Sequence, residues 1–327
     1  MILPMARLDA LRLISHCPAG LRQFSGIAGL LGALGAAACG QAGVIEPEAP
    51  TAAVNHRLAA PARARLETEV LRASVEVFGI EIATLESSLC APSDASASLE
   101  TAVAAAPLVE IIRRTSGEAK TELVAAGRAP RSSDYTFRDG DIVRHYQVDY
   151  RDGAYAYVYD NGGVERRTGV NEIPEGAEPH DMHSSMLLLR AWRPRLDETA
   201  HFYVVLGRRP WRVDVTSRGP EMIKLGDEPR LTYRIDGVAV RVDPPGVEGT
   251  APKRFSLWLS EDGDRVPLRM VADASFGQVT MTLTGRDTDA RGCTPSVVAG
   301  ANGSLERPRA GSGSIGTAWS TEASRAR

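Results

Sequence analysis

Alternation of apolar and polar residues around Asp-Gly pairs is the feature that most limits how this chain can fold. Three such pairs, at 152–153, 236–237 and 262–263, each separate two runs in which every second residue is apolar. A period of two places apolar side chains on one face of a β-strand and polar ones on the other. Asp-Gly suits tight turns because both residues tolerate positive φ. Each pair therefore predicts a β-hairpin with one buried face.

Further alternating runs extend this β pattern over much of the chain. They predict strands at 66–77, 79–89, 118–126, 201–207, 211–216 and 276–284. An antiparallel sheet of about ten or more strands has to curl. We therefore expect a mostly β fold: a large curved antiparallel sheet, as a barrel, a half-barrel or a sandwich, with one or two short helices.

Two segments interrupt the alternation and predict helices. In residues 181–192, a capping residue, Asp181, precedes apolar residues at helical spacing. This pattern predicts a helix of about three turns that lies against the sheet. Residues 99–113 predict a second helix, which is either interrupted near Pro107 or continues into a strand.

The chain begins with an order of residues that is typical of a bacterial export signal. Three arginines precede a charge-free stretch at 26–38, which ends in three alanines before Cys39. This stretch is shorter than the ~20 residues that a membrane-spanning helix needs, so we expect residues 1–38 to be removed. Cys39 then becomes the candidate site of lipidation. Ordinary cleavage after the three alanines fits the same residues.

Composition divides the remaining chain into three parts. Residues 39–64 are rich in Ala, Pro and Glu without periodicity, which predicts a disordered spacer. Residues 285–327 are dominated by Gly, Ser, Ala, Thr and Arg and have too little apolar surface to offset the entropy of ordering. This predicts a disordered tail, which leaves the antiparallel β domain at 65–284.

Charge and cysteine content limit the partners and the cross-links. The formal net charge is −3, and the 38 basic and 41 acidic residues are interspersed, which argues against a nucleic-acid partner. Two cysteines, Cys90 and Cys293, lie beyond Cys39. In an oxidising envelope they either close a disulfide or stay separate thiols, and the sequence favours neither outcome.

One short segment holds residue types that catalysis and metal binding use. His180, Asp181 and His183 resemble part of a metal-ligand set, and Ser184 and Ser185 beside them suggest a hydrolase. Helix capping by Asp181 explains the same residues, and no G-x-S-x-G, P-loop or dinucleotide-binding motif occurs. We therefore predict no metal, no cofactor and no catalytic residue. A hydrolase that uses Asp181, His183 and a serine stays an alternative.

Aromatic and basic residues form two further candidate sites. Five of the eight tyrosines would share the faces of one hairpin as a stripe: Tyr146, Tyr150, Tyr155, Tyr157 and Tyr159. Such a stripe suits an apolar ligand, but cross-strand tyrosines also stabilise sheets, and this second role is favoured. Arg209 and Trp211 either bind an anionic head group or form a solvated turn with the tryptophan packed inward, and the solvated turn is favoured.

The last predicted strands resemble a known bacterial family. The residues at 253–260, 264–269 and 277–279 are similar to the closing hairpins of the family labelled domain of unknown function 3108. Asp181-x-x-Ser184 resembles its helical segment.

The resemblance covers roughly 115–284, and residues 91–113 look like an insertion. It implies an exported or lipid-anchored β protein without an assigned activity. It also implies a curved sheet similar to that of envelope carriers of lipids and lipoproteins, although a shared fold does not establish a shared function.

These observations lead to a first interpretation and two alternatives. The first is a non-enzymatic cell-envelope protein, periplasmic or an outer-membrane lipoprotein. Its sheet would bind an apolar or lipid-like ligand or aid envelope transport or assembly, and its partners would be a membrane, through a lipid anchor, and an envelope protein. The second is a structural or protein-interaction module with a filled core. The third is the hydrolase described above.

Overall fold

The structure is a computed structural model that describes residues 56–58, 67–93, 96–112, 114–124, 129–243, 249–274 and 277–288. The expected export signal, Cys39, Cys293 and most of the expected spacer and tail lie outside these residues. Within the described part of the chain, no helix is long and apolar enough to cross a membrane.

The strands are β1 (His56–Arg57), β2 (Glu69–Val77), β3 (Ile80–Ser93), β4 (Ser96–Ala105), β5 (Thr115–Val124), β6 (Pro130–Asp139), β7 (Ile142–Arg151), β8 (Ala154–Asn161), β9 (Arg166–Glu172), β10 (Pro179–His180), β11 (Thr199–Leu206), β12 (Arg209–Leu225), β13 (Glu228–Arg241), β14 (Lys253–Ser260), β15 (Pro267–Ala274) and β16 (Gly277–Asp287). Helix α3 (Pro107–Ile112) connects β4 to β5, and helix α4 (Met182–Ala191) follows β10.

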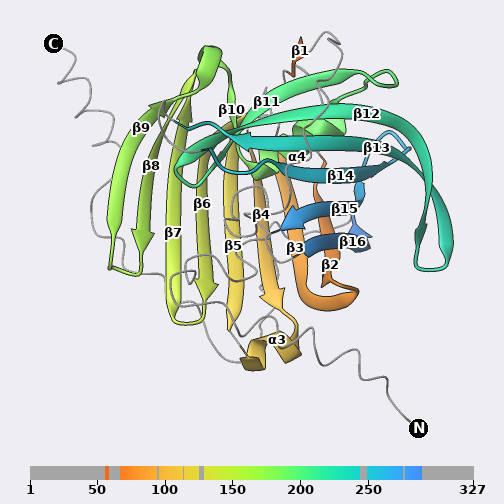
Figure 1. The fold of residues 1–327 in the computed structure, drawn as a ribbon, viewed down its shortest axis with the longest axis horizontal. Coiled ribbons are helices and arrows are strands. Elements are labelled where there is room, and N and C mark those ends of the chain that lie inside the picture. Colours follow the sequence, from red (N-terminus) through yellow and green to blue (C-terminus); the bar gives the residue numbers. More distant parts are fainter. Residues whose placement is uncertain are drawn as a thin grey trace.

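All of these strands belong to one sheet, built from two antiparallel meanders. One meander runs from β2 to β9 and the other from β11 to β16, and β16 pairs with β2 to join them. The short strands β1 and β10 pair with β11 in parallel. Figure 1 shows that the two meanders form walls whose strands cross steeply, with α4 between them. The expected fold class, a large curved antiparallel sheet with short helices, is confirmed.

The sheet is an open half-barrel, because no backbone pairing joins β9 to β11 among the described residues. Side chains cover this seam instead. Val148, Tyr150 and Tyr155 of the first wall pack with Tyr203 and Val205 of β11 in one buried cluster. The two ends of the sheet are therefore held together by packing rather than by a ladder of hydrogen bonds.

The largest cluster of buried apolar side chains lies between α4 and the second wall. Leu188, Leu189 and Trp192 pack there against Trp211 of β12 and Leu257 of β14, among others. Alternate residues of β11 to β14 point into this cluster, as the period of two in their sequences requires.

Two of the three expected Asp-Gly hairpins are confirmed. Asp152-Gly153 connects β7 to β8, and Gly153 has a φ of +69° as a tight turn requires. The pair at 262–263 lies in the connection between β14 and β15. The helix expected at 181–192 is also confirmed as α4.

The hairpin expected at Asp236-Gly237 is wrong, because β13 runs straight through this pair. Gly237 lies opposite Phe255 of β14, and a Cβ at Gly237 would be 2.1 Å from the Phe255 ring. The glycine therefore makes room for a core aromatic side chain and does not mark a turn. The apolar alternation changes phase at Gly237, so Val240 lies on the outer face and is 37% exposed.

The second expected helix is also partly wrong. Residues 99–105 belong to strand β4, and only Pro107–Ile112 are helical, so a strand leads into a helix and not the reverse. The alternating burial of Ala97, Leu99 and Val103 on the inner face accounts for the strand. Pro107 occupies the first helical position, where its fixed φ and missing N–H are tolerated.

Candidate functional site

Helix α4 begins with reciprocal hydrogen bonds between Asp181 and Ser184. The Ser184 backbone N–H donates to Asp181 Oδ1 at 2.7 Å, and the Asp181 backbone N–H donates to Ser184 Oγ at 2.9 Å. This capping box satisfies two backbone donors that a helix start otherwise leaves without partners. The capping role expected for Asp181 is thus confirmed.

The second carboxylate oxygen of Asp181 ties α4 to the inner face of the first wall. Oδ2 accepts hydrogen bonds from Thr121 on β5 and from Ser133 and Tyr135 on β6, the last two at 2.7 and 3.0 Å. All four side chains are buried. Hydrogen bonds to an ionised group are about twice as strong as neutral ones, so this contact fixes the start of the helix.

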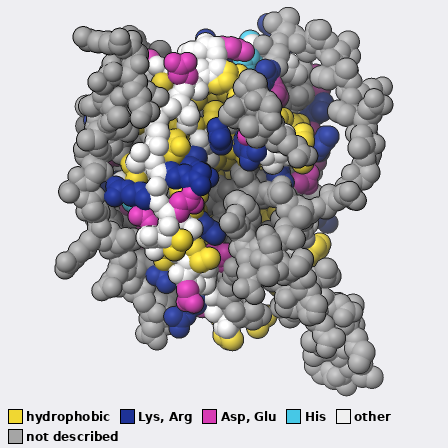
Figure 2. All heavy atoms as spheres, turned by 60° about the vertical axis from the view of Figure 1, so that its left-hand side comes forward, with side chains coloured by type: hydrophobic (Ala, Val, Ile, Leu, Met, Phe, Trp, Pro, Cys, Tyr) yellow, Lys and Arg dark blue, Asp and Glu magenta, His cyan; other side chains and the backbone are white. Residues whose placement is uncertain are grey.

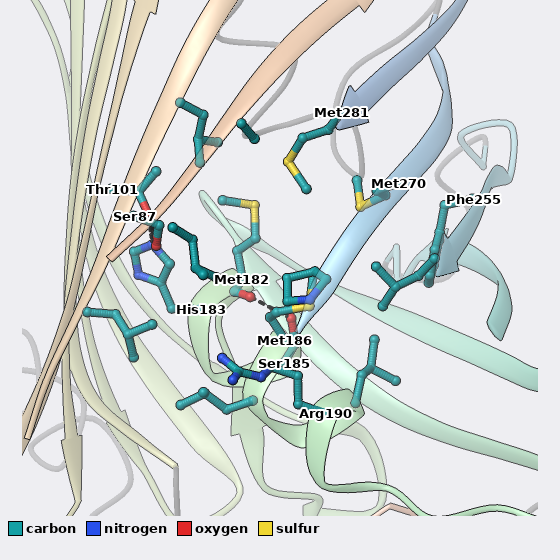
Figure 3. A pocket seen from close by; sticks show the side chains of 18 of the residues that line it. Ser87, Thr101, Met182, His183, Ser185, Met186, Arg190, Phe255, Met270 and Met281 are labelled. Atoms are coloured by element: carbon teal, nitrogen blue, oxygen red, sulfur yellow. Dashed lines mark hydrogen bonds between the residues drawn. The ribbon is translucent and has the colours of Figure 1, made fainter. Parts of the chain in front are cut away.

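His183 extends the same network to two more strands. Its Nδ1 lies 2.7 Å from Thr121 Oγ1, and its Nε2 lies 2.8 Å from Thr101 Oγ1 on β4. Thr101 Oγ1 is also hydrogen-bonded to Ser87 Oγ on β3 at 2.9 Å. Figure 3 shows Ser87, Thr101 and His183 side by side at one edge of a cavity. Polar side chains from four neighbouring strands therefore converge on the first turn of α4.

Burial and the neighbouring charges set the protonation of this pair. Burial alone would raise the pKa of Asp181, but His183 and the hydrogen bonds from Ser184 and the strand hydroxyls bring it below its ordinary value. Burial lowers the pKa of His183, and the charge of Asp181 offsets only part of that effect. At neutral pH, Asp181 is therefore an ionised carboxylate and His183 a neutral imidazole.

The two serines of α4 bond to the helix itself. Ser184 Oγ belongs to the capping box, and Ser185 Oγ donates to Met182 O at 2.8 Å. Both ring nitrogens of His183 contact threonines. A hydrolase triad needs a nucleophile hydrogen-bonded to its histidine, and neither serine takes that position. The hydrogen bonds of these residues therefore position helix α4 and do not form a catalytic triad.

A cavity of about 170 Å³ lies beside α4, between the helix and both walls, with Ser87, Thr101 and His183 of the polar network at one edge. Its lining combines the inner faces of β2–β4, β11, β12 and β14–β16 with buried and half-buried side chains of α4. Most of these side chains are aliphatic, such as Leu71, Leu85, Val204 and Leu283. The cavity is therefore apolar and is assembled from segments that are far apart in the sequence.

Methionine is unusually concentrated in this lining. Four of the seven methionines of the chain contribute to it: Met182, Met186, Met270 and Met281. Figure 3 shows them converging from α4, β15 and β16, with Phe255 at the far wall. Methionine is flexible and polarisable, and it is common at surfaces that accept varied apolar partners. This wall of the cavity can thus adapt to ligands of different shape.

One corner of the cavity carries a buried ion pair. Arg190, near the end of α4, donates through Nη1 to Oε1 of Glu69 on β2, and both residues line the cavity. Arg286 donates to the other oxygen of Glu69 at 3.2 Å. The side chains of Glu69 and Arg190 are 4% and 12% exposed. Since the carboxylate lies between two guanidinium groups, this corner is polar but its charges are already paired.

The tyrosines expected to line a ligand site lie elsewhere. They do form a stripe, because Tyr146 pairs with Tyr159 and Tyr150 pairs with Tyr155 across the hairpin. Tyr155 OH donates to Arg208 O at 3.1 Å, across the seam of the half-barrel. The stripe therefore covers the seam, and none of its members, Tyr157 included, is among the residues that line the described cavity.

The remaining candidate residues are also away from the cavity. Arg209 is exposed at the start of β12, and Trp211 is 1% exposed in the core between α4 and the second wall. Cys90 is buried in β3, whereas Cys39 and Cys293 lie outside the described residues. No group of His, Cys, Asp and Glu in the described part of the chain is arranged to hold a metal ion.

Comparison with known proteins places this fold in a family. A family model described as a protein of unknown function, DUF3108, matches residues 81–284. The chain belongs to the DUF3108 family. The match begins at residue 81, before the expected 115, and it spans residues 91–113.

The other comparisons give this DUF3108 chain no curated relative and two solved structures of similar shape. A search of curated proteins finds no match. The crystal structure of a β-barrel-like protein of domain of unknown function DUF1849 from Brucella abortus is 11% identical, covers 68% of this chain and 98% of its own, and has a TM-score of 0.48. A protein with a YmcC-like fold from Bacteroides fragilis is 8% identical, covers 72% and 100%, and has a TM-score of 0.31.

Part of the DUF3108 cavity lining left a signal in the sequence that single-segment reasoning missed. Met182 and Met186 are four residues apart in the expected helix and share one of its faces. Met270 and Met281 stand at inward positions of two neighbouring strands, where they pair directly. The four side chains meet because β15 pairs with β16 and both strands lie close to α4, which the sequence does not show.

Proposed function

We propose that this DUF3108 protein is a non-enzymatic cell-envelope protein that binds an apolar or lipid-like ligand between α4 and the curved sheet. The cavity of about 170 Å³ is the observation that supports this proposal most directly. Protein interiors contain few voids larger than a water molecule.

The size and chemistry of the cavity favour a hydrocarbon chain. A cavity of about 170 Å³ is well above the ~10–15 Å³ that holds one water molecule, so it has room for several methylene groups. A short acyl chain, or part of a longer one, fits this space. Each buried methylene contributes about 0.8 kcal/mol, and the methionines can adjust to different chain lengths.

The expected location follows from the start of the chain. Residues 1–38 have the order of an export signal, and lipidation of Cys39 would tether the domain to a membrane. We therefore place the protein in the periplasm or at the outer membrane. A lipid-like ligand would be available in either place.

The two alternatives have less support. A structural or interaction module with a filled core does not need a cavity lined by four methionines. A hydrolase using Asp181 and His183 needs a nucleophile against the histidine, but the serines of α4 bond to the helix. Neither alternative predicts a bound hydrocarbon, so an assay for a bound ligand distinguishes both of them from the proposal.

The proposal is tested by mass and by binding. The protein is purified from its own envelope and its mass is measured under native conditions and again after denaturing extraction with organic solvent. We expect extra mass that is lost only on extraction, and displacement of anilinonaphthalene sulfonate by fatty acids from hexanoate to palmitate. A bare polypeptide in both states, with no dye or fatty acid bound, would refute ligand binding.

A matched pair of variants shows whether binding occurs in this cavity. Ala272 lines the cavity, whereas Ala239 lies in the adjacent core cluster and not in the lining. Ala272→Leu should weaken fatty-acid binding about tenfold or more, since the added side chain occupies the space of the ligand. Ala239→Leu should leave the affinity of the folded fraction within about twofold.

A further inference from the structure

Exposed apolar side chains gather at one end of the first wall. The turns β2–β3, β4–β5, β6–β7 and β8–β9 all lie at this end, because alternate connections of a meander share one edge. Each carries at least one large exposed hydrophobic residue, and together these residues form the apolar rim: Phe78, Ile80, Leu108, Ile111, Ile142 and Val164. Figure 1 shows the four connections at the lower end of the molecule, and Figure 2 shows hydrophobic side chains there among charged ones.

The tip of the first turn has a backbone conformation that its side chain disfavours. Phe78 and Gly79 form the two-residue connection between β2 and β3, with φ of +53° and +73°. Positive φ at both positions is usual for Asn-Gly and is unfavourable for a bulky residue such as phenylalanine. Phe78 is also 70% exposed. Its ring lies against Gly277 of β16, where a Cβ would be 2.6 Å away, but most of the side chain stays exposed, and strain of this kind points to a function.

Helix α3 contributes the second pair of exposed side chains and one contact to the interior. Leu108 and Ile111 are 55% and 82% exposed. Val109, between them, packs against the buried cluster formed by β2, β3, β4 and β16. The helix therefore lies across the end of the sheet with apolar side chains on both its inner and its outer side.

The buried cluster under α3 connects the rim with the cavity. Leu85, Met182, Val279 and Met281 belong both to this cluster and to the cavity lining. Val109 of α3 belongs to the cluster as well. Apolar side chains of this packed cluster thus lie between the cavity and the rim, and no buried charge of the described residues belongs to the cluster.

We propose that the apolar rim docks on the surface of a lipid bilayer and that the bound hydrocarbon passes between bilayer and cavity at this end. This inference rests on the proposed ligand-binding function. The apolar cluster that lies between α3 and the cavity supports a lipid surface as the occupant, because an apolar ligand is most soluble in an apolar phase.

The chemistry of the rim also favours lipid over a protein partner. Its six side chains stand on four separate turns, whereas the centre of a protein interface is a continuous packed patch. Charges of both signs lie beside them, such as Arg114, Asp141, Glu165 and Arg166. A mixed rim does not present the single-sign surface that selects a charged partner. Shallow insertion of apolar tips between head groups fits this arrangement.

The test measures vesicle binding by a chain that starts at Gly40. This chain keeps every described strand and helix and removes any contribution from a lipid anchor or an export signal. Cosedimentation is measured with phosphatidylcholine vesicles, with and without phosphatidylglycerol. The rim variant is Phe78→Asn with Ile111→Ser. The control is Met222→Ser with Leu231→Ser, two exposed residues that pair in the β12–β13 hairpin of the second wall.

We expect the rim variant to partition about tenfold or more weakly into both kinds of vesicle, and the control to partition like the unmodified chain. Phe78→Asn should also raise the melting temperature slightly, because asparagine tolerates positive φ. A purely structural role of Phe78 predicts the opposite change. Equal binding by the rim variant and the unmodified chain would overturn the proposal.

Two further results separate the possible causes of failure. The unmodified chain could fail to bind vesicles and instead form a dimer that the rim variant does not form in analytical ultracentrifugation. The apolar rim would then bind a second copy of the chain, and the lipid proposal would be wrong. Uptake of anilinonaphthalene sulfonate without vesicles tests the cavity alone. If the rim variant binds both dye and vesicles like the unmodified chain, only the docking proposal is refuted. If the unmodified chain takes up no dye, the proposed ligand-binding function is refuted.

Discussion

The two sides of helix α4 are held by different kinds of contact. Toward β3–β6, Asp181 and His183 meet a row of hydroxyl groups through short hydrogen bonds. Toward β14–β16, Met182 and Met186 face a cavity. Hydrogen bonds are directional, so they fix the first turn of the helix, while Leu188, Leu189 and Trp192 anchor its later turns in the core. The stretch that carries Met182 and Met186 lies between these two anchors, and this leaves room for a ligand.

Removal of the Asp181 carboxylate should disrupt the polar side most strongly. Asp181→Ala leaves three buried hydroxyl groups and the start of α4 without their shared acceptor. We expect the free energy of unfolding in urea to fall by about 3 kcal/mol or more. Asp141→Ala, at the exposed turn between β6 and β7, should change it by less than about 0.5 kcal/mol. Similar losses in the two variants would show that the network does not hold the helix.

Acidification should weaken the same end of the helix through His180. This residue is buried, neither ring nitrogen has a hydrogen-bond partner in the described structure, and burial lowers its pKa to about 4. The unfolded chain, with a histidine pKa near ~6.5, binds the proton more tightly. Stability is therefore fully present above about pH 6.5 and is lost as the pH falls toward 4, by about 2 kcal/mol between pH 7 and 5.

The variant His180→Phe isolates this contribution. Phenylalanine preserves the edge contact with Phe202 and cannot be protonated. The difference in unfolding free energy between the variant and the unmodified chain should grow as the pH is lowered from 7 to 5. A difference that stays constant with pH would assign the acid sensitivity to other groups, including His183.

The cavity side should respond to substitution in the opposite direction from the polar side. Ala272→Leu adds methyl groups where there is space, and we expect a gain of about 1 kcal/mol in the unfolding free energy. Ala239→Leu adds the same groups to a filled part of the neighbouring core and should lose about 1–3 kcal/mol. Urea unfolding measures both. A loss at position 272 as large as that at 239 would mean that the cavity cannot accept a side chain.

Local patterns predicted the elements of this fold better than their arrangement. The capping residue Asp181 and the turn at Asp152-Gly153 act within a few residues, so their sequence signals were sufficient. Gly237 carries the same local signal as a turn, but its role is set by Phe255 of the neighbouring strand. Tertiary packing decides such cases, and one sequence does not display it.

The candidate site was less predictable for the same reason. Alternation predicts the tyrosine stripe, but its position at the seam depends on where β11 lies in the fold. The cavity joins residues from Glu69 to Leu283, and no short segment contains enough of them to form a motif. Asp181 and His183 were recognised as unusual, yet the threonines that bind them lie on strands whose order was unknown.

The pairing of β16 with β2 also affects how the cavity comes into existence. Val279 pairs with Val77, and β16 and β2 both contribute side chains to the lining. Contacts between residues so far apart form late in folding, because a long loop must close before they are gained. The enclosed space therefore cannot form until nearly the whole domain has emerged during synthesis. A ligand can be captured only by a chain whose last strand has docked.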